Sequence, residues 1–199
     1  MELFMASKIK PCACLPEFLV NGTCIACDGS KERNTNREKT IRRNLTRRSP
    51  SLEDFQSFKG AHCKNLWLKV GNDWCCPGCQ RTKFELLRWT MLYPNRPNRH
   101  MGWAAGVHEH HDHGMDAFGG RFFCDSRYTP RFAPTVVCEQ CNSADASAKK
   151  SLGMGNDFSF SPSEIFRFIT PTPHGWHLFH YSVAEEIHKT IQPAMHTFF

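Results

Sequence analysis

The sequence predicts an α+β fold in which bound metal supplements a modest hydrophobic core. Apolar residues alternate through 101–111, and the β-branched segment 134–138 follows, two patterns typical of strands. An alanine-rich segment, 142–152, comes directly afterwards and favours a helix. Apolar residues make up 40% of the 199 residues, and eleven cysteines accompany them. A chain of this length usually forms one domain, so we expect a single core helped by cysteine-bound metal.

Further helices are expected on both sides of these strands. A short helix is favoured around Ile41, and an apolar stripe at i, i+3 and i+7 predicts a helix over 82–92. The segment SPSE, which begins at Ser161, supplies a serine cap, a proline at the first helical position and a glutamate in the first turn. A last helix is expected over 180–192, where Pro193 would end it.

Positive charge is concentrated in the segment 31–48. This segment holds eight lysines and arginines against Glu32 and Glu38, which gives +6, and the formal net charge of the whole chain is also +6. The rest of the chain is therefore close to neutral. Such a distribution is typical of an arm that follows a polyanion, although a solvated helix face would look the same.

The sequence shows no segment expected to enter a membrane. Lys8, Lys10 and Pro11 interrupt the N-terminal apolar residues, and no run of about 18 apolar residues occurs. The odd number of cysteines and their short spacings favour thiols over a disulfide framework, as in a reducing compartment. We therefore expect a soluble cytoplasmic protein with no membrane partner.

Two C-x2-C pairs predict a structural zinc site. Cys76 and Cys79 flank a turn-forming Pro-Gly, and Cys138 and Cys141 follow the second predicted strand. Four thiolates complete a tetrahedral zinc site and leave no position for water, so this zinc would be structural. The alternative is two pairs of buried, reduced cysteines.

The N-terminal cysteines predict a second zinc site. Four thiols lie within sixteen residues: Cys12, Cys14, Cys24 and Cys27. We expect them to form a second structural zinc knuckle, although the C-x-C spacing is less usual than C-x2-C. Cys63, Cys75 and Cys124 are left over and are interpreted as free thiols.

The segment GVHEHHDHG, residues 106–114, places four histidines between the two cysteine pairs: His108, His110, His111 and His113. Asn142 directly follows the last cysteine of the second pair. The order is a cysteine pair, a histidine-rich strand end, a second strand, a second cysteine pair, an asparagine and a helix. Over residues 74–152 this order resembles the HNH (ββα-metal, His-Me finger) nucleases, especially the recombination endonuclease VII branch and zinc-containing HNH restriction enzymes.

The resemblance implies roles for individual residues. His111 matches the general base, and Asn142 matches a ligand of the catalytic metal. His110 stands where that branch has a metal-binding aspartate, and other HNH nucleases have histidine there. The ion would be Mg²⁺, with Mn²⁺ or Ni²⁺ as alternatives. Further candidate metal ligands are Asp112, Asp145 and His108, and Asp112 with His113 is the alternative active pair.

The resemblance also implies a DNA endonuclease. We expect a sequence-specific restriction-type homodimer that cuts double-stranded DNA and needs no small-molecule cofactor. The candidate phosphate contacts are Arg37, Arg42, Arg43, Arg47, Arg48, Lys149 and Lys150. The expected divisions are an N-terminal knuckle with a basic arm (1–60), a nuclease core (61–155) and a helical C-terminal segment (156–199).

Other functions remain open on the sequence alone. A non-catalytic zinc-dependent DNA-binding protein would use the same cysteines and the same basic arm, and a junction-resolving or homing nuclease would use the same core. A zinc hydrolase acting on a small molecule would leave the arginine-rich segment without a purpose.

Overall fold

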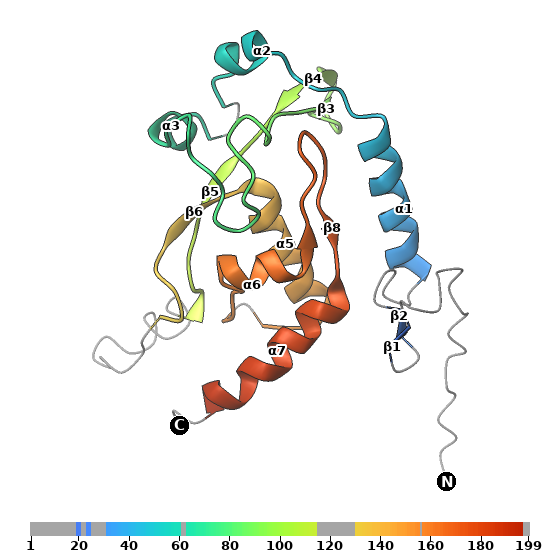
Figure 1. The fold of residues 1–199 in the computed structure, drawn as a ribbon, viewed down its shortest axis with the longest axis vertical. Coiled ribbons are helices and arrows are strands. Elements are labelled where there is room, and N and C mark those ends of the chain that lie inside the picture. The colour runs from blue at the N-terminus through green and yellow to red at the C-terminus, as the bar shows by residue number, and fades with distance from the viewer. Residues whose placement is uncertain are drawn as a thin grey trace.

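The computed structural model describes residues 19–20, 23–24, 31–60, 63–114, 130–155 and 157–196. Within these ranges it combines helices with small antiparallel sheets, as Figure 1 shows. This confirms the mixed α+β class at the level of secondary structure. Of the cysteines predicted to form the second zinc knuckle, Cys12, Cys14 and Cys27 lie outside the described residues, as does Cys124.

The described strands pair in four two-stranded antiparallel sheets. These are β1 (Leu19–Val20) with β2 (Thr23–Cys24), β3 (Arg88–Leu92) with β4 (His100–Ala104), β5 (Val107–His110) with β6 (Thr135–Cys138), and β7 (Ile169–Thr170) with β8 (Leu178–Phe179). The helices are α1 (Lys31–Leu45), α2 (Leu52–Ser57), α3 (Lys64–Lys69), α5 (Glu139–Ser151), α6 (Pro162–Arg167) and α7 (Tyr181–His196). None of the described helices is long and apolar enough to cross a membrane.

The centre of the fold is the unit formed by β5, β6 and α5. The strands pair from Val107 opposite Cys138 to His110 opposite Thr135, and α5 begins directly after β6. The sequence suggested one strand over 101–111, but the chain breaks into β4 and β5 at Gly106. A Cβ at Gly106 would lie 3.1 Å from the Cβ of Glu139, and the Gly106 carbonyl accepts the Glu139 N–H at 2.8 Å. Glycine therefore lets the start of α5 approach the strand closely.

The helix predicted over 82–92 is wrong. The chain instead turns at Thr82, whose N–H and hydroxyl both donate to Glu85, and continues as β3. Cross-strand pairing with β4 outweighs the helical stripe, because Trp89 lies opposite Trp103 with ring centroids 5.1 Å apart. The helical pattern and the strand share apolar residues, so the local sequence is compatible with both. Pairing with β4 determines that the strand forms.

The predicted start of α6 is confirmed, whereas the predicted end of α7 is not. Ser161 and Glu164 form a capping box in which each side chain accepts the other residue's backbone N–H. α7 continues through Pro193 to His196. Within a helix a proline removes the single bond that its own N–H would donate, so one extra turn can persist beyond it.

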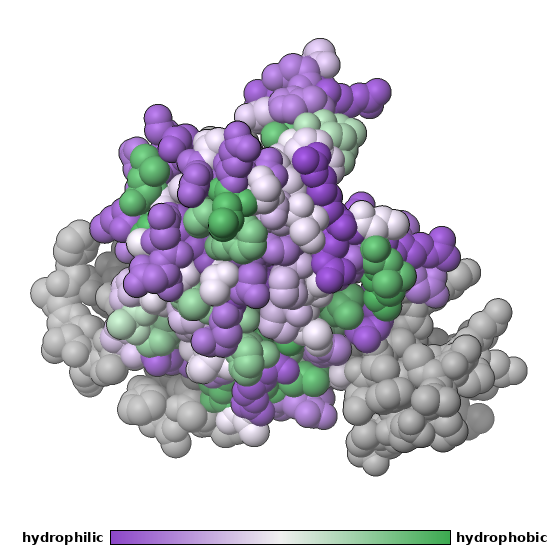
Figure 2. Space-filling model, turned by 45° about the horizontal axis from the view of Figure 1, so that its top comes forward, coloured by the Kyte–Doolittle hydropathy of each residue, from purple (hydrophilic) through white to green (hydrophobic). Residues whose placement is uncertain are grey.

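One hydrophobic core joins the cysteine-bearing segments to the C-terminal helices. Phe160 is fully buried, and its ring packs edge-to-face on Phe158 and Phe168, with centroids 4.9 and 5.0 Å away. Trp67, Leu87, Val107, Val137, Ile165 and Ile187 lie in the same cluster. On the face that Figure 2 displays, hydrophilic residues dominate, and hydrophobic residues form small separate patches. Figure 1 places α5 near the middle of the view, between the β5–β6 pair and α1.

The basic helix α1 is attached to the C-terminal part of the chain by one buried side chain. Asn44 donates to the carbonyl of Trp176 at 2.8 Å, and its carboxamide oxygen accepts the Trp176 N–H at 2.7 Å. The short helix expected around Ile41 is thus confirmed and is longer than expected, with 15 residues.

Candidate metal centre

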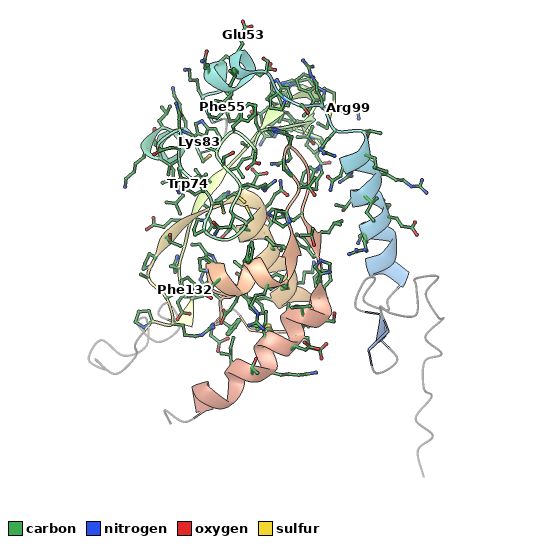
Figure 3. All side chains as sticks on the ribbon, viewed as in Figure 1. Glu53, Phe55, Trp74, Lys83, Arg99 and Phe132 are labelled. Carbon is green, nitrogen blue, oxygen red and sulfur yellow. The ribbon has the colours of Figure 1, made fainter. Side chains whose placement is uncertain are left out.

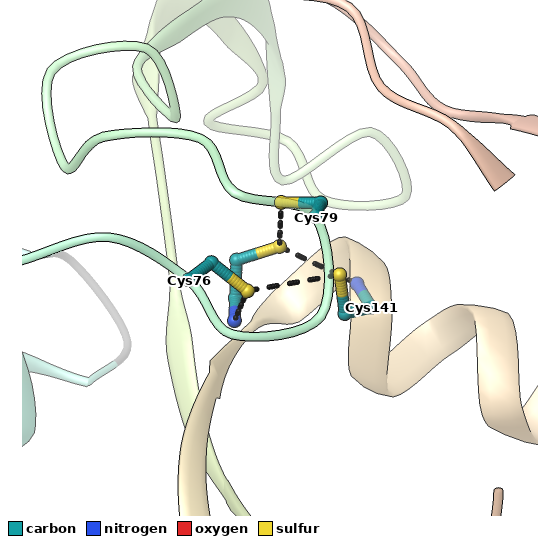
Figure 4. A group of neighbouring side chains, drawn as sticks. Cys76, Cys79 and Cys141 are labelled. Carbon is teal, nitrogen blue, oxygen red and sulfur yellow. Dashed lines mark hydrogen bonds between the residues drawn. The ribbon is translucent and has the colours of Figure 1, made fainter. Parts of the chain in front are cut away.

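Four cysteines from two distant parts of the chain meet in the core. Cys76 and Cys79 come from the turn after α3, Cys138 ends β6, and Cys141 lies in the first turn of α5. All four are buried, and their sulfur atoms lie within 4.8 Å of one another (Figure 4). Within the described ranges this is the only such group of histidine, cysteine or acidic residues.

The spacing of the sulfur atoms fits a tetrahedral zinc ion. The Cys76 and Cys141 sulfurs lie 3.7 Å apart, as do those of Cys79 and Cys138. A zinc ion with four Zn–S bonds of about 2.3 Å requires sulfur atoms about 3.8 Å apart. The predicted group of four cysteines is therefore assembled in a geometry that could hold zinc, and such an ion would join the N-terminus of α5 to the turn after α3.

The turn between Cys76 and Cys79 depends on its glycine. The N–H groups of Cys79 and Gln80 both donate to the carbonyl of Cys76, at 3.3 and 2.7 Å, and close the turn. A Cβ on Gly78 would lie 3.0 Å from the Cys141 sulfur. Glycine therefore lets the turn approach α5 closely enough for the four sulfur atoms to meet.

Two buried cationic or polar side chains line the sulfur cluster, and the sequence pattern gave no reason to select them. The Arg81 guanidinium donates to the sulfurs of Cys79 and Cys138 at 3.4 and 3.5 Å, and also to backbone carbonyls of the segment before β8. His177 Nε2 lies 3.5 Å from the Cys141 sulfur and 3.3 Å from Arg81 Nη2. A zinc tetrathiolate carries two net negative charges, which Arg81 would partly offset.

The side chains around the cluster change the acidity of its members. Burial raises the pKa of Cys138, but hydrogen bonds from Cys141, Cys76 and Cys79 hold it well below its ordinary range. The hydrogen bond with Cys138 raises the pKa of Cys79, while those from Cys141 and Cys76 lower it to a net value of about 5. Burial lowers the pKa of Arg81, but the negative charges of Cys138 and Cys79 raise it by more. The net pKa is therefore above its ordinary value, and Arg81 stays charged. The hydrogen bond with Cys138 raises the pKa of Cys76 and that of Cys141, so metal binding would release protons from these thiols.

Replacing Arg81 by methionine is expected to weaken zinc binding by roughly 10- to 100-fold, the usual effect of removing a residue that supports metal ligands. Arg81→Lys keeps the charge but loses the paired N–H donors, so it should restore only part of the affinity. Competition with a chromophoric zinc chelator measures both variants. Equal affinity in the methionine variant and the wild type would show that Arg81 only fills space.

The histidine cluster lies on β5 and in the loop after it, and His110 is the last residue of β5. His110 is 2% exposed, stacks on Phe132 at a centroid distance of 5.2 Å, and its Nε2 lies 2.7 Å from the carbonyl of Phe160. Figure 3 shows Phe132 beside the far end of the β5–β6 pair. Asp145 of α5 accepts the Phe160 N–H at 2.8 Å and pairs with Lys149 at 2.8 Å. A single peptide segment thus connects His110 to Asp145.

The next residues form the loop after β5. His111 and His113 are half-buried, and their ring centroids lie 4.5 Å apart. Asp112 lies between them and is buried. One of its carboxylate oxygens accepts the Gly114 N–H at 3.1 Å, and the other accepts the Arg131 N–H at 2.9 Å. The carboxylate of Asp112 therefore ties together two parts of the loop.

The other predicted site residues are spread over several surfaces. Asn142 is half-buried in the first turn of α5, and His108 is exposed on β5. Lys149 donates to the Phe158 carbonyl at 2.9 Å, whereas Lys150 is exposed. Among the described residues, the histidines and acidic groups near His111 do not come together as the four cysteines do.

The predicted phosphate contacts also differ in their surroundings. Arg48 lies over the rings of Trp89 and Trp103, 4.5 and 5.3 Å from their centroids, and Arg43 lies over Trp176 at 5.8 Å. Arg47 donates to the carbonyl of Asn44, whereas Arg42 is exposed. Part of the basic segment is thus used for packing.

Two of the leftover cysteines, Cys63 and Cys75, are described and do not belong to the four-cysteine cluster. The Cys63 sulfur accepts the Val107 N–H at 3.3 Å and is half-buried. Cys75 is exposed, although it is next to Cys76 in the sequence. Both are free thiols, as predicted.

These features define a mixed helix-and-sheet protein with a four-cysteine cluster that could hold a metal such as zinc. Comparison of the chain with protein-family models, with curated proteins and with solved structures gives no match.

Proposed function

We propose that this chain is a metal-dependent DNA endonuclease of the HNH type. One observation carries the proposal: two antiparallel strands and a helix, β5, β6 and α5, follow one another around the cysteine cluster, and the histidine cluster spans β5 and the loop after it. A zinc bound by the cysteines would hold the start of α5, and with it Asn142, in a fixed position relative to β5.

The surroundings of His110 support a role as a metal ligand. Histidines that bind metals usually donate their second ring N–H to a carboxylate or a backbone carbonyl, which fixes the ring. His110 has this arrangement, because its Nε2 lies 2.7 Å from the Phe160 carbonyl and Nδ1 remains as the ligand nitrogen. In the proposal His110 and Asn142 hold the catalytic ion, and Asp145 acts as a positioning residue through the Phe160 peptide.

The proposed chemistry needs a base and a centre of positive charge. His111, half-buried in the loop after β5, would accept a proton from the attacking water, because a neutral imidazole is the usual base near pH 7. A bound divalent ion such as Mg²⁺ would neutralise the charge that develops on the phosphate oxygens. Sequence-specific cleavage by a homodimer is the proposed biological form.

A second candidate function is a zinc-dependent DNA-binding protein without catalysis. It is favoured by the observation that, in the described part of the chain, only the cysteines form a complete group of metal ligands. In that case the basic helix α1 would still bind DNA, and no metal would produce cleavage.

Incubation of the purified protein with plasmid and phage DNA tests the proposal. We expect DNA cleavage that requires Mg²⁺, Mn²⁺ or Ni²⁺ and that a chelator abolishes. The His111→Ala protein, purified in parallel, should not cleave the DNA. Discrete fragments would support sequence-specific cutting. Absence of cleavage for methylated, unmethylated and branched DNA with every metal would reject the nuclease and leave the binding protein.

A further inference from the structure

The ribbon formed by β3 and β4, residues 88–104, is firmly held at its base. Arg88 pairs with Glu139 of α5, and the Trp103 indole N–H donates to Asp54 at 2.8 Å. The guanidinium of Arg48 covers the edge-to-face pair of Trp89 and Trp103. The base therefore contacts α5, α2 and the segment after α1, so the orientation of the ribbon is fixed.

The tip of the ribbon consists of two successive turns with the same sequence, Pro-Asn-Arg. The Arg96 N–H donates to the Tyr93 carbonyl at 2.9 Å, and the Arg99 N–H donates to the Arg96 carbonyl at 3.1 Å. Each turn has a proline, Pro94 or Pro97, at its second position, where the fixed proline φ favours a β-turn. The tip is therefore conformationally restricted, and its ordering on binding a partner costs less.

The tip is exposed and carries only positive charge. Every residue from 94 to 101 is exposed, and the ribbon contains three arginines and no acidic residue. Its exposed polar side chains are Asn95, Arg96, Asn98, Arg99 and His100. Next to the tip, the paired residues Met91 and Met101 are 42% and 46% exposed. Neither methionine contributes to the core, so folding alone does not account for this surface.

We propose that the β3–β4 ribbon enters the major groove of double-stranded DNA and contacts base edges. The major groove is about 12 Å wide and 8.5 Å deep and admits a two-stranded ribbon. Strands of five residues are about 17 Å long, which is enough to reach the groove floor. An arginine side chain donates hydrogen bonds to two acceptors of guanine, and an asparagine side chain forms two hydrogen bonds with adenine. An apolar side chain contacts the thymine methyl group. The tip and the two methionines next to it present all three kinds of side chain. This inference rests on the proposed function, which supplies the DNA substrate.

The position of the ribbon suggests a division of roles with α1. Arg48, which follows α1, stacks on the base of the ribbon, so the helix and the ribbon are connected. Figure 3 shows Arg99 at the outer edge of the molecule, in the region where α1 ends. The exposed basic residues of α1, such as Lys39 and Arg42, would contact phosphates, while the ribbon would distinguish bases.

Selection of bound sequences from a random duplex library, in chelator so that no cleavage occurs, tests the inference. The wild-type protein should enrich a sequence motif. Arg96→Ala combined with Arg99→Ala should lose preference at the contacted positions, by roughly 5- to 150-fold for each arginine. Lys39→Ala combined with Arg42→Ala removes the same charge and is the matched control. It should keep the motif, weaken binding to all sequences and lower the salt slope by about 0.9 per lost contact.

Each outcome decides the inference separately from the nuclease proposal. The inference would be overturned if the ribbon variant enriched the same motif as the wild type. It would also be overturned if the wild type enriched no motif, or if it bound single-stranded DNA or RNA more tightly than duplex DNA. Cleavage assays on the same proteins report on the nuclease independently. Motif loss in a protein that never cuts DNA would support the ribbon and reject the nuclease. Unchanged thermal unfolding checks that the exposed substitutions leave the fold intact.

Discussion

Replacing Cys141 by serine is expected to remove one equivalent of zinc and to abolish cooperative folding of the core. The Cys141 sulfur is fully buried and lies 3.7 Å from that of Cys76, so it would complete the tetrahedral site that joins α5 to the turn after α3. Structural zinc contributes about 10–16 kcal/mol in zinc-finger peptides, whereas whole domains are stable by only about 5–15 kcal/mol. Metal analysis and thermal unfolding followed by circular dichroism measure the two effects.

Cys75→Ser is the matched control for this experiment. Cys75 is adjacent to Cys76 in the sequence, but its sulfur is exposed, and its only described hydrogen bond is a 3.8 Å contact with the Asp73 carbonyl. This variant should keep its zinc content and its melting temperature. If Cys141→Ser also kept both, the cluster would be a group of reduced, buried cysteines, the alternative that the sequence left open.

The features that the sequence predicted well depend on neighbouring residues. The cap of α6 needs only Ser161, Pro162 and Glu164, which lie within four positions. The cysteine pairs similarly have a spacing that metal binding requires, so their partnership could be predicted although Cys79 and Cys138 are far apart in the chain. Local chemistry was sufficient in both cases.

The features that the sequence did not predict depend on contacts between distant residues. Arg81 and His177 are 96 positions apart in the sequence and meet at the sulfur cluster with a distance of 3.3 Å between their nitrogens. Neither belongs to a recognisable spacing, although Arg81 lies two positions after Cys79. The second half of the segment 82–92 likewise forms strand β3 because β4 pairs with it, which its own apolar pattern does not reveal. Prediction of such features requires the fold.

His111→Ala is expected to lower the rate of DNA cleavage by about 10²- to 10⁴-fold, the usual contribution of a general base. His111 is half-buried, and its ring is next to that of His113. DNA affinity in chelator should stay unchanged, because a base acts only on the attacking water. Single-turnover cleavage at saturating protein measures the rate of the chemical step.

His113→Ala is the comparison that decides between the two candidate active pairs. If Asp112 bound the metal and His113 were the base, the Asp112 carboxylate would have to bind the ion as well as the Gly114 and Arg131 N–H groups. These bonds orient the carboxylate and hold the loop together, so the proposal keeps His110 and His111 as the active pair. We therefore expect His113→Ala to slow cleavage less than His111→Ala does.

Added imidazole should restore part of the rate of whichever variant lacks the base, since a small base can enter the vacated space but cannot repair a displaced loop. Rescue of His113→Ala alone would assign the base to His113.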